Sequence, residues 1–377
     1  MNTPQPEPTR VLVVLPTWVG DTVMATPALR LLRDRLPGVF LGALARPGVD
    51  HILEGSNLFD ELHHAPPSGI MAPKVAAQRV RTRRYASALL LTNSFSTALS
   101  IRLAAIPRRL GYDRDGRAML LTEHLTPQRR RDVSPYRNSR TDPSAWAPVP
   151  ACEYYARLVR AFLKDDRARE RSLELNVSPT QAQAGAELLH RAGLSDNEPF
   201  CVLNPGGNNP AKRWPADRFA HLAAHLIRRR ALRVLINGSP AESKLTDEVI
   251  AHIRSAHPDI ADRAVALPNL GGSLASLKEL LRRAALLVTN DTGPRHIAAA
   301  FSTPVLTLFG PTDHRWTTLT PWLPKGGAER ILLADPTLPE EEVANDHPDR
   351  CRIENITLDD VIDACDELLT PKRAPAD

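Results

Sequence analysis

The sequence is poor in cysteine and contains no long apolar run. Its 377 residues include four scattered cysteines without a CxxC pair, so neither a disulfide framework nor a zinc site is indicated. The polar start "MNTPQPEPTR" precedes an apolar run that is too short for a signal peptide or a membrane span. We therefore expect a cytoplasmic protein that is at most peripheral to a membrane.

The chain also lacks a recognisable nucleic-acid-binding motif. The arginines at 129–131 have no interleaved aromatic residues, which is more typical of a solvated basic loop than of a nucleic-acid surface. The formal net charge of +5 still favours partners that carry phosphate, such as a nucleotide or an anionic membrane face. His221 and His225 lie one helical turn apart without a third ligand, so no metal site is expected.

The length and the hydrophobic pattern predict two α/β domains. A chain of 377 residues exceeds the size at which one core usually stops growing. Short apolar runs such as "VLVVL", "SALLLTN" and "ALLVTN" alternate with helical patterns, which indicates parallel sheets covered by helices on both faces. The Pro-, Arg- and Ser-rich segment 126–150 interrupts this alternation and is predicted to be a mobile loop.

Three predicted strand-to-helix junctions combine glycine with polar or charged residues. Backbone amides at a helix N-terminus are unpaired and partly positive, glycine lets a ligand approach the backbone, and lysine adds a charge suited to phosphate. Open α/β sheets bind ligands at the carboxyl ends of their strands. The junctions are "GD" at 20–21, "NPGGNNPAKRWP" at 204–215 and "TNDTGPRH" at 289–296.

Each junction also has a purely structural interpretation. The glycines at 206 and 207 could form a common tight turn beside a surface lysine. Asp291 could be a helix N-cap, and His296 could be a buried core histidine with no role in binding. The residues alone leave these alternatives open.

Four stretches together resemble a known enzyme family. They are "WVGDTVMATPALRLLRDRLPG", "NSFSTALSIRLAAIPRRLGY", "NPGGNNPAKRWP" and "VTNDTGPRHIAAAFSTPVLTLFGPT". In this order they are similar to the ADP-heptose:lipopolysaccharide heptosyltransferases of glycosyltransferase family 9, and most similar to the heptosyltransferase II branch. The resemblance runs from about residue 10 to about residue 370.

The resemblance implies a GT-B fold with two Rossmann-like domains facing each other across a cleft. Domain 1–177 would bind the acceptor and domain 178–377 the nucleotide sugar, and we expect helix 358–369 to pack back on the first domain. The implied reaction is inverting transfer of L-glycero-D-manno-heptose from ADP-heptose to a heptose of the lipopolysaccharide inner core, without a metal or other cofactor. The acceptor would be a lipid A-linked core oligosaccharide at the inner face of the inner membrane, with no nucleic acid involved.

The resemblance also implies roles for individual residues. Asp21 matches the family's proposed general base, and Lys212 matches the lysine that contacts the donor phosphates. Asp291 matches the aspartate that contacts the donor sugar, and Glu242, in "GSPAES", matches the acid that holds the ribose. The further donor-side residues are Gly206, Gly207, Asn208, Thr292, Gly293 and His296, and the acceptor-side residues are Thr17, Trp18, Gly20 and Asn93.

Two other functions remain as alternatives. A nucleotide-sugar epimerase of GT-B architecture would release a free epimerised sugar from the donor alone. A non-catalytic nucleotide-binding protein, in which Asp21 only caps a helix, would tolerate its replacement by Asn. The resemblance also departs from the family at Arg295, where apolar or small residues are usual.

Overall fold

The computed structural model describes residues 10–169, 171–195 and 197–370. The described chain divides into two compact units. The first unit runs to Asp132 and resumes over Ser144–Asn176. The second unit consists of Val133–Pro143 and the chain from Val177 onward. An eleven-residue segment from the first half of the sequence therefore belongs to the second unit.

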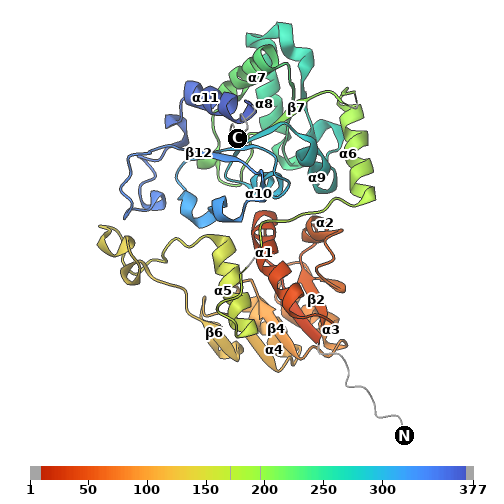
Figure 1. Ribbon diagram of the computed structural model, residues 1–377, viewed down its shortest axis with the longest axis vertical. Coiled ribbons are helices and arrows are strands. Elements are labelled where there is room, and N and C mark those ends of the chain that lie inside the picture. Colours follow the sequence, from red (N-terminus) through yellow and green to blue (C-terminus); the bar gives the residue numbers. More distant parts are fainter. Residues whose placement is uncertain (1–9, 170, 196, 371–377) are drawn as a thin grey trace, which may run out of the picture. The chain divides into compact units, whose positions relative to one another are not determined.

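The first unit is built on a six-stranded sheet with the order β3-β2-β1-β4-β5-β6, in which all neighbours are parallel. The expected strand "VLVVL" overlaps β1, and "SALLLTN" contains β4, which Figure 1 labels. The strands are β1 Arg10–Val14, β2 Phe40–Ala45, β3 Glu61–His64, β4 Ser87–Leu90, β5 Arg108–Tyr112 and β6 Glu123–Leu125. The α-helices are α1 Val19–Arg35, α2 Val49–Leu53, α3 Ala72–Arg81, α4 Phe95–Leu103 and α5 Ala151–Leu163.

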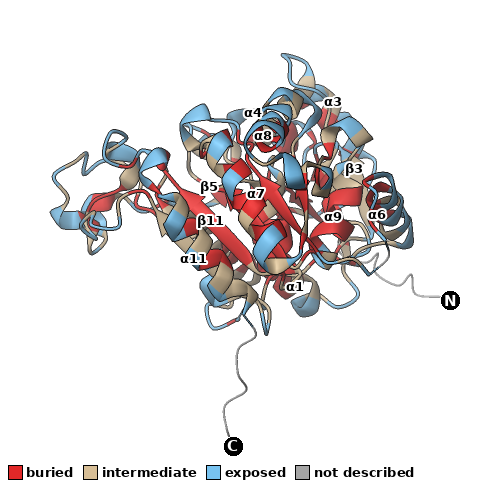
Figure 2. Cartoon of the chain, turned by 90° about the horizontal axis from the view of Figure 1, so that it is seen from above, coloured by how far each residue is buried: buried red, intermediate tan, exposed pale blue. Residues whose placement is uncertain are grey.

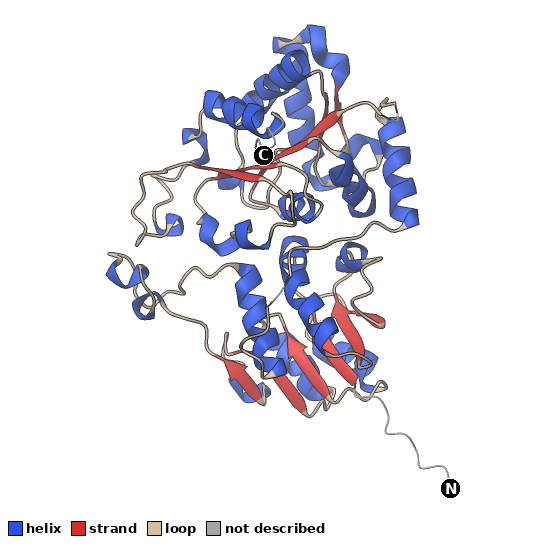
Figure 3. Ribbon diagram, in the orientation of Figure 1, coloured by secondary structure: helices blue, strands red, loops and turns tan. Residues whose placement is uncertain are grey.

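The second unit repeats this plan with the strand order β12-β11-β10-β7-β8-β9, again with parallel neighbours. Figure 3 shows its strands with helices packed around them. The strands are β7 Phe200–Asn204, β8 Arg233–Ile236, β9 Ala264–Ala266, β10 Leu286–Asn290, β11 Val305–Phe309 and β12 Glu329–Leu333. The α-helices are α6 Pro179–Arg191, α7 Ala216–Arg230, α8 Ser243–Ala256, α9 Leu274–Arg283, α10 Gly293–Ala300 and α11 Leu358–Leu369.

The predicted α/β class with parallel sheets is confirmed. The central strands are buried because helices cover both faces, whereas the outer faces of the helices are exposed (Figure 2). The strands that the hydrophobic pattern did not predict are mostly short and have partly exposed residues, so they carry a weak periodic signal. These strands are β3, β5, β6, β9 and β12.

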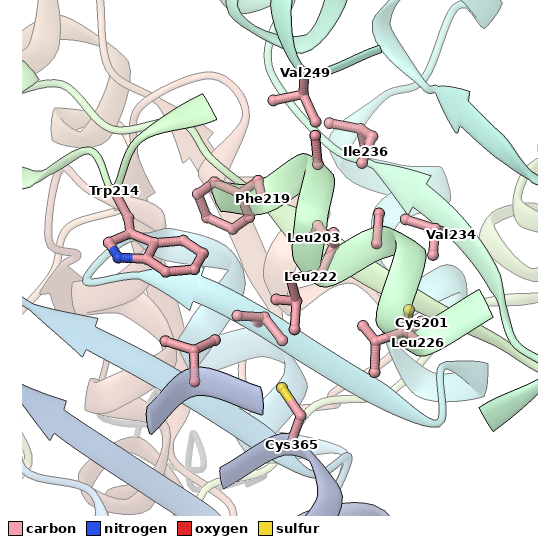
Figure 4. Packing of buried hydrophobic residues seen from close by; sticks show 14 of the residues in the cluster. Cys201, Leu203, Trp214, Phe219, Leu222, Leu226, Val234, Ile236, Val249 and Cys365 are labelled. Carbon is pink, nitrogen blue, oxygen red and sulfur yellow. The ribbon is translucent and has the colours of Figure 1, made fainter. Parts of the chain in front are cut away.

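The hydrophobic core of the second unit centres on α7. Trp214 and Phe219 meet edge to face, with ring centroids 5.1 Å apart, and both side chains are buried (Figure 4). The Trp214 indole Nε1 donates a hydrogen bond of 2.9 Å to the Ile356 carbonyl oxygen, so its polar atom is satisfied inside the core. This packing holds the loop before α7 against the sheet.

The expected position of the last helix is wrong. Helix α11 buries Val361, Ala364 and Cys365 in the core of the second unit, together with Cys201 of β7 (Figure 4). It contacts α7 and strands β10, β11 and β12. An apolar stripe shows that a helix needs a partner but not which sheet supplies it, and here the second sheet does.

The segment 126–150 contains short ordered elements. Its 3₁₀ turns are η2 Arg130–Asp132 and η3 Tyr136–Asn138, and an antiparallel bridge pairs Arg129 with Trp146. Glu342 accepts hydrogen bonds from the Ser139 hydroxyl (3.2 Å) and the Arg140 amide (3.1 Å). These contacts attach part of the segment to the second unit, and its mobility remains a prediction.

We predict that Phe219→Ala destabilises the second unit by about 3–5 kcal/mol, because the lost ring leaves a cavity in a closely packed core. Thermal and urea unfolding followed by tryptophan fluorescence measures the change. Phe95→Ala is the control, since that ring is 44% exposed and its loss should cost no more than about 0.5 kcal/mol. Equal unfolding midpoints for the two variants would contradict the described core.

Candidate active site

Most of the predicted site residues follow the strands at which the strand order reverses. In the first sheet β1 and β4 are neighbours, and in the second sheet β7 and β10 are neighbours, although each pair is far apart in sequence. At such positions the connections leave in opposite directions and open a crevice at the carboxyl ends of the strands. Asp21 and Asn93 follow β1 and β4, and the glycine-rich turn and Asp291 follow β7 and β10.

Asp21 lies in the first turn of α1 but does not cap it. The helix begins at Val19 and its N-cap is Trp18, so an N-capping role does not explain the carboxylate. The Tyr155 hydroxyl donates a hydrogen bond of 2.9 Å to Asp21 Oδ1. Burial, and secondarily the neighbouring carboxylate, raise the pKa of Tyr155 well above its usual value, so this hydroxyl stays protonated and fixes the orientation of Asp21.

A second tyrosine of α5 contacts the loop that follows β4. The Tyr154 hydroxyl donates to Asn93 Oδ1 at 3.0 Å, and the Tyr154 ring stacks on Tyr112 with centroids 3.8 Å apart. Consecutive tyrosines thus link the two loops of the first unit. Neither tyrosine was predicted as a site residue, because "YY" within a helical pattern is typical of core packing. The other acceptor-side residues adjoin Asp21: Thr17 is half-buried, Trp18 is 63% exposed and Gly20 is buried.

In the second unit a polar ladder joins the ends of three strands. The Asn204 amide nitrogen donates to the hydroxyls of Thr289 (3.1 Å) and Thr292 (3.0 Å). Its Oδ1 accepts a hydrogen bond of 2.6 Å from the Asn237 amide. Asn204 was not predicted as a site residue, although its sequence signal is an asparagine at the end of the apolar strand "FCVLN". The ladder holds Thr292 at the start of α10.

Glu242 holds the glycine-rich turn. Its carboxylate accepts hydrogen bonds from the Gly207 amide (2.8 Å) and from the Ser239 amide (2.9 Å) and hydroxyl (2.8 Å). Burial acts to raise the pKa of Glu242, but these hydrogen bonds outweigh it and keep the pKa below its usual value. A Cβ at Gly206 would meet the Glu242 carboxylate, so a larger residue there would displace the group that holds the turn.

Asp291 is held between two cations. Its Oδ2 accepts from Lys212 Nζ at 3.2 Å, and its Oδ1 accepts from Arg295 Nη1 and from the Thr317 hydroxyl, each at 3.2 Å. The N-cap of α10 is Thr292, so Asp291 is not the capping residue. Burial acts to raise the pKa of Asp291, but the neighbouring cations outweigh it and lower the pKa. The carboxylate is therefore ionised at neutral pH.

The remaining donor-side residues differ in exposure. Asn208 is exposed, and Gly293 is the half-buried first residue of α10. The side chain of His296 is buried, and its Nδ1 has no hydrogen-bond partner within the described part of the chain. Burial, followed by the charge of Arg295, lowers the pKa of His296 to about 3, so the ring is neutral. Its contact with the donor remains a prediction.

The structure thus collects two groups of predicted residues, one in each unit. Around α10, the positive charge of Lys212 and the partly positive amides of the helix N-terminus have the chemistry that suits phosphate. In residues 10–169, 171–195 and 197–370, no three His, Cys, Asp or Glu side chains gather where they could hold a metal ion. Within the same residues, no helix combines the length and apolar character of a membrane span.

Comparison with known proteins identifies the relatives of this chain. A family model described as "Glycosyltransferase family 9 (heptosyltransferase)" matches residues 75–342. Lipopolysaccharide heptosyltransferase 2 of Salmonella typhimurium is 28% identical over 320 residues, which cover 82% of this chain and 84% of that protein. The E. coli K12 protein of the same name is 28% identical with the same coverage.

Two solved structures share the fold. E. coli ADP-heptose lipopolysaccharide heptosyltransferase II superimposes with a TM-score of 0.73 and 25% identity, covering 96% of this chain and 98% of that one. A family 9 glycosyl transferase from Veillonella parvula gives a TM-score of 0.72 at 19% identity, covering 96% and 97%. The GT-B fold class and the family resemblance predicted from the four motifs are confirmed.

The neutral, buried His296 predicts a pH dependence of stability. Because its pKa is about 3 in the folded chain and about 6.5 when unfolded, the unfolded state binds the additional proton between these values. Its contribution to stability is therefore complete above about pH 6.5 and is lost as the pH falls toward about 3. The difference in unfolding free energy between wild type and His296→Gln should shrink by about 1 kcal/mol or more from pH 7 to pH 5. A difference that is constant over this range would contradict the buried neutral ring.

Proposed function

We propose that this chain, which belongs to glycosyltransferase family 9, transfers L-glycero-D-manno-heptose from ADP-heptose to a heptose of the lipopolysaccharide inner core. The family makes the chain a glycosyltransferase of the heptosyltransferase type. The choice of donor and acceptor is supported by relatives named heptosyltransferase 2, which are 27–28% identical over more than four fifths of the chain. The domain assignment made from the sequence, with acceptor on the first unit and donor on the second, is part of this proposal.

The observation that carries the proposal is the charged site at the end of β7 and β10. Lys212 reaches this site with a side chain that is 23% exposed, next to the N-terminal amides of α10. As the bond between the sugar and the phosphate breaks, negative charge develops on the diphosphate, and Lys212 and the helix amides stabilise it. Glu242, on the neighbouring turn, is the proposed acceptor of hydrogen bonds from the ribose hydroxyls.

Asp21 is the proposed general base. The acceptor hydroxyl oxygen forms a bond to the anomeric carbon, the bond from that carbon to the phosphate oxygen breaks, and ADP leaves with the electron pair. The acceptor hydroxyl gives its proton to Asp21. A carboxylate whose orientation is fixed by Tyr155 suits this role, because proton transfer requires the base within hydrogen-bond reach.

The acceptor also suggests where the enzyme works. A lipid A-linked core oligosaccharide lies in the membrane, so we propose that the protein acts at the cytoplasmic face of the inner membrane through peripheral contact. The net charge of +5 suits an acceptor that carries phosphates and acidic sugars.

The direct experiment is transfer by the purified protein. With ADP-heptose and a heptose-primed core acceptor, we expect the acceptor to gain the mass of one heptose while ADP is released, and calorimetry should show binding of ADP in preference to UDP and GDP. Release of an epimerised sugar from donor alone would support the epimerase alternative. Absence of both transfer and ADP binding, across several acceptors, would refute the proposal.

Replacing the proposed base should separate chemistry from donor binding. We expect Asp21→Asn to lower kcat by about 100-fold to 10,000-fold, since a positioned base contributes that much, while the ADP dissociation constant stays at the wild-type value. Asp34→Asn on the same helix is the control, because Asp34 pairs only with a largely exposed Arg171 among the contacts described for it. Full turnover of the Asp21 variant would exclude it as the base.

Tyr155 should act as a positioning residue. Tyr155→Phe keeps the buried ring but removes the hydrogen bond to Asp21, and we expect kcat to fall about tenfold, with the KM for the donor unchanged. Steady-state kinetics with both substrates varied gives the two parameters separately. An increase in donor KM with unchanged kcat would mean that Tyr155 does not act through the base.

A further inference from the structure

Four side chains of alternating charge form a series of ion pairs in the second unit, beginning at Lys212. Lys212 pairs with Asp291, Asp291 pairs with Arg295, and Arg295 pairs with Glu329 at the start of β12. The exposed fractions of these side chains are 23%, 9%, 0% and 1% in that order. Of these four side chains, a ligand can therefore reach Lys212, whereas Arg295 is enclosed.

Hydrogen bonds and an aromatic contact hold the Arg295 guanidinium in place. Its Nε and Nη2 donate to Glu329 at 2.6 and 3.2 Å, and its Nη1 donates to Asp291 at 3.2 Å and to the Thr317 hydroxyl at 2.7 Å. The guanidinium carbon lies 4.9 Å from the centroid of the Phe309 ring. A buried guanidinium whose three nitrogens are all hydrogen-bonded cannot move to a substrate. Any effect of Arg295 on catalysis is therefore transmitted through Asp291.

Once a donor is bound, two anions compete for Lys212: the Asp291 carboxylate and the donor diphosphate. In the structure it pairs with Asp291, but the proposed function requires it to face the diphosphate. When Lys212 turns toward the phosphates, Asp291 loses one of its cations while it remains largely buried. A buried carboxylate without a compensating charge takes up a proton, and a protonated Asp291 would no longer accept hydrogen bonds at both oxygens from the donor sugar.

We infer that Arg295 is a positioning residue that keeps Asp291 ionised and oriented while the donor diphosphate engages Lys212. This inference rests on the proposed function. Glu329 serves to hold the guanidinium, and the Thr307 hydroxyl donates to Glu329 at 2.9 Å. Arg295 does not touch the donor.

The charged and titratable side chains around Asp291 determine whether its carboxylate stays ionised. Lys212 approaches from the turn after β7, and Arg295 and His296 approach from α10. The His296 ring is neutral, because burial lowers its pKa to about 3. His314 lies near Arg295 and Glu329, and burial lowers its pKa as well. In the part of the chain that the structure describes, Lys212 and Arg295 therefore supply the positive charge at Asp291.

The test compares proton uptake on ADP binding between charge variants. Arg295→Met alone would leave Glu329 buried without a cation, so the informative variant is the double change Arg295→Met with Glu329→Gln, which removes one charge of each sign. Calorimetry of ADP binding at pH 6 to 7, in buffers of different ionisation enthalpy, gives affinity and proton uptake together. Relative to wild type, we expect affinity at least about tenfold weaker and an additional uptake approaching one proton.

Two further variants separate charge from structure. Arg295→Lys keeps the charge but loses the paired hydrogen bonds, and we expect its proton uptake to match wild type. The matched control removes an exposed pair from the same unit, Arg228→Met with Asp259→Asn, whose partners lie 2.6 Å apart, and it should match wild type in both quantities.

The outcomes distinguish this inference from the proposed function. A folded double variant with wild-type affinity and proton uptake would overturn the inference, and so would an Arg295→Lys protein that takes up the additional proton. If the double variant does not fold, Arg295→Lys remains the test, and an additional proton taken up by that variant would overturn the inference. Failure of the wild-type protein to bind ADP would instead refute the proposed function on which the inference rests.

Discussion

The order of the parallel strands in each sheet is the constraint on which the candidate site depends. The ladder between β7 and β10 places Asn204 beside Thr292, residues 88 positions apart in sequence, at 3.0 Å. In the first unit the same arrangement makes β1 and β4 neighbours, so the loops with Asp21 and Asn93 leave adjacent strands. A change of strand order would separate these residues even if every helix and strand formed.

The buried ion pair between Arg295 and Glu329 is better explained by function than by stability. Removing charged groups from water is costly, and a buried ion pair often contributes less than apolar residues of similar volume would. Arg295 and Glu329 are nevertheless almost fully enclosed. Arg295 contacts Asp291 directly through Nη1, whereas Glu329 holds the guanidinium through Nε and Nη2. Such a pair is useful where a carboxylate such as Asp291 must remain ionised in a largely buried position. The same logic applies to Tyr155, whose protonated hydroxyl fixes a carboxylate without neutralising it.

The sequence predicted the features that depend on local pattern. Buried strands, amphipathic helices and the glycine and charged residues at their junctions all have short-range signals. Asp21, Lys212 and Asp291 were therefore expected at strand-to-helix junctions, where they lie. The partners that orient them come from distant segments. Tyr155 lies 134 residues from Asp21, and Glu329 lies 34 residues from Arg295. No local periodicity encodes such pairs, because tertiary packing decides them.

Tertiary packing also explains why parts of the predicted fold were wrong. The last helix, α11, was expected from its sequence, but its burial against β10–β12 depends on which sheet has a face left to cover. The association of Val133–Pro143 with the second unit depends on contacts such as that between Ser139 and Glu342, 203 residues apart. Composition indicated only a polar connection there.

The most direct test of the central claim is a crystal structure of the protein with ADP bound. We predict that the diphosphate lies within hydrogen-bond distance of Lys212 Nζ and of the amides that begin α10, with the ribose hydroxyls at Glu242. A diphosphate bound elsewhere in the second unit, or on the first unit, would contradict it.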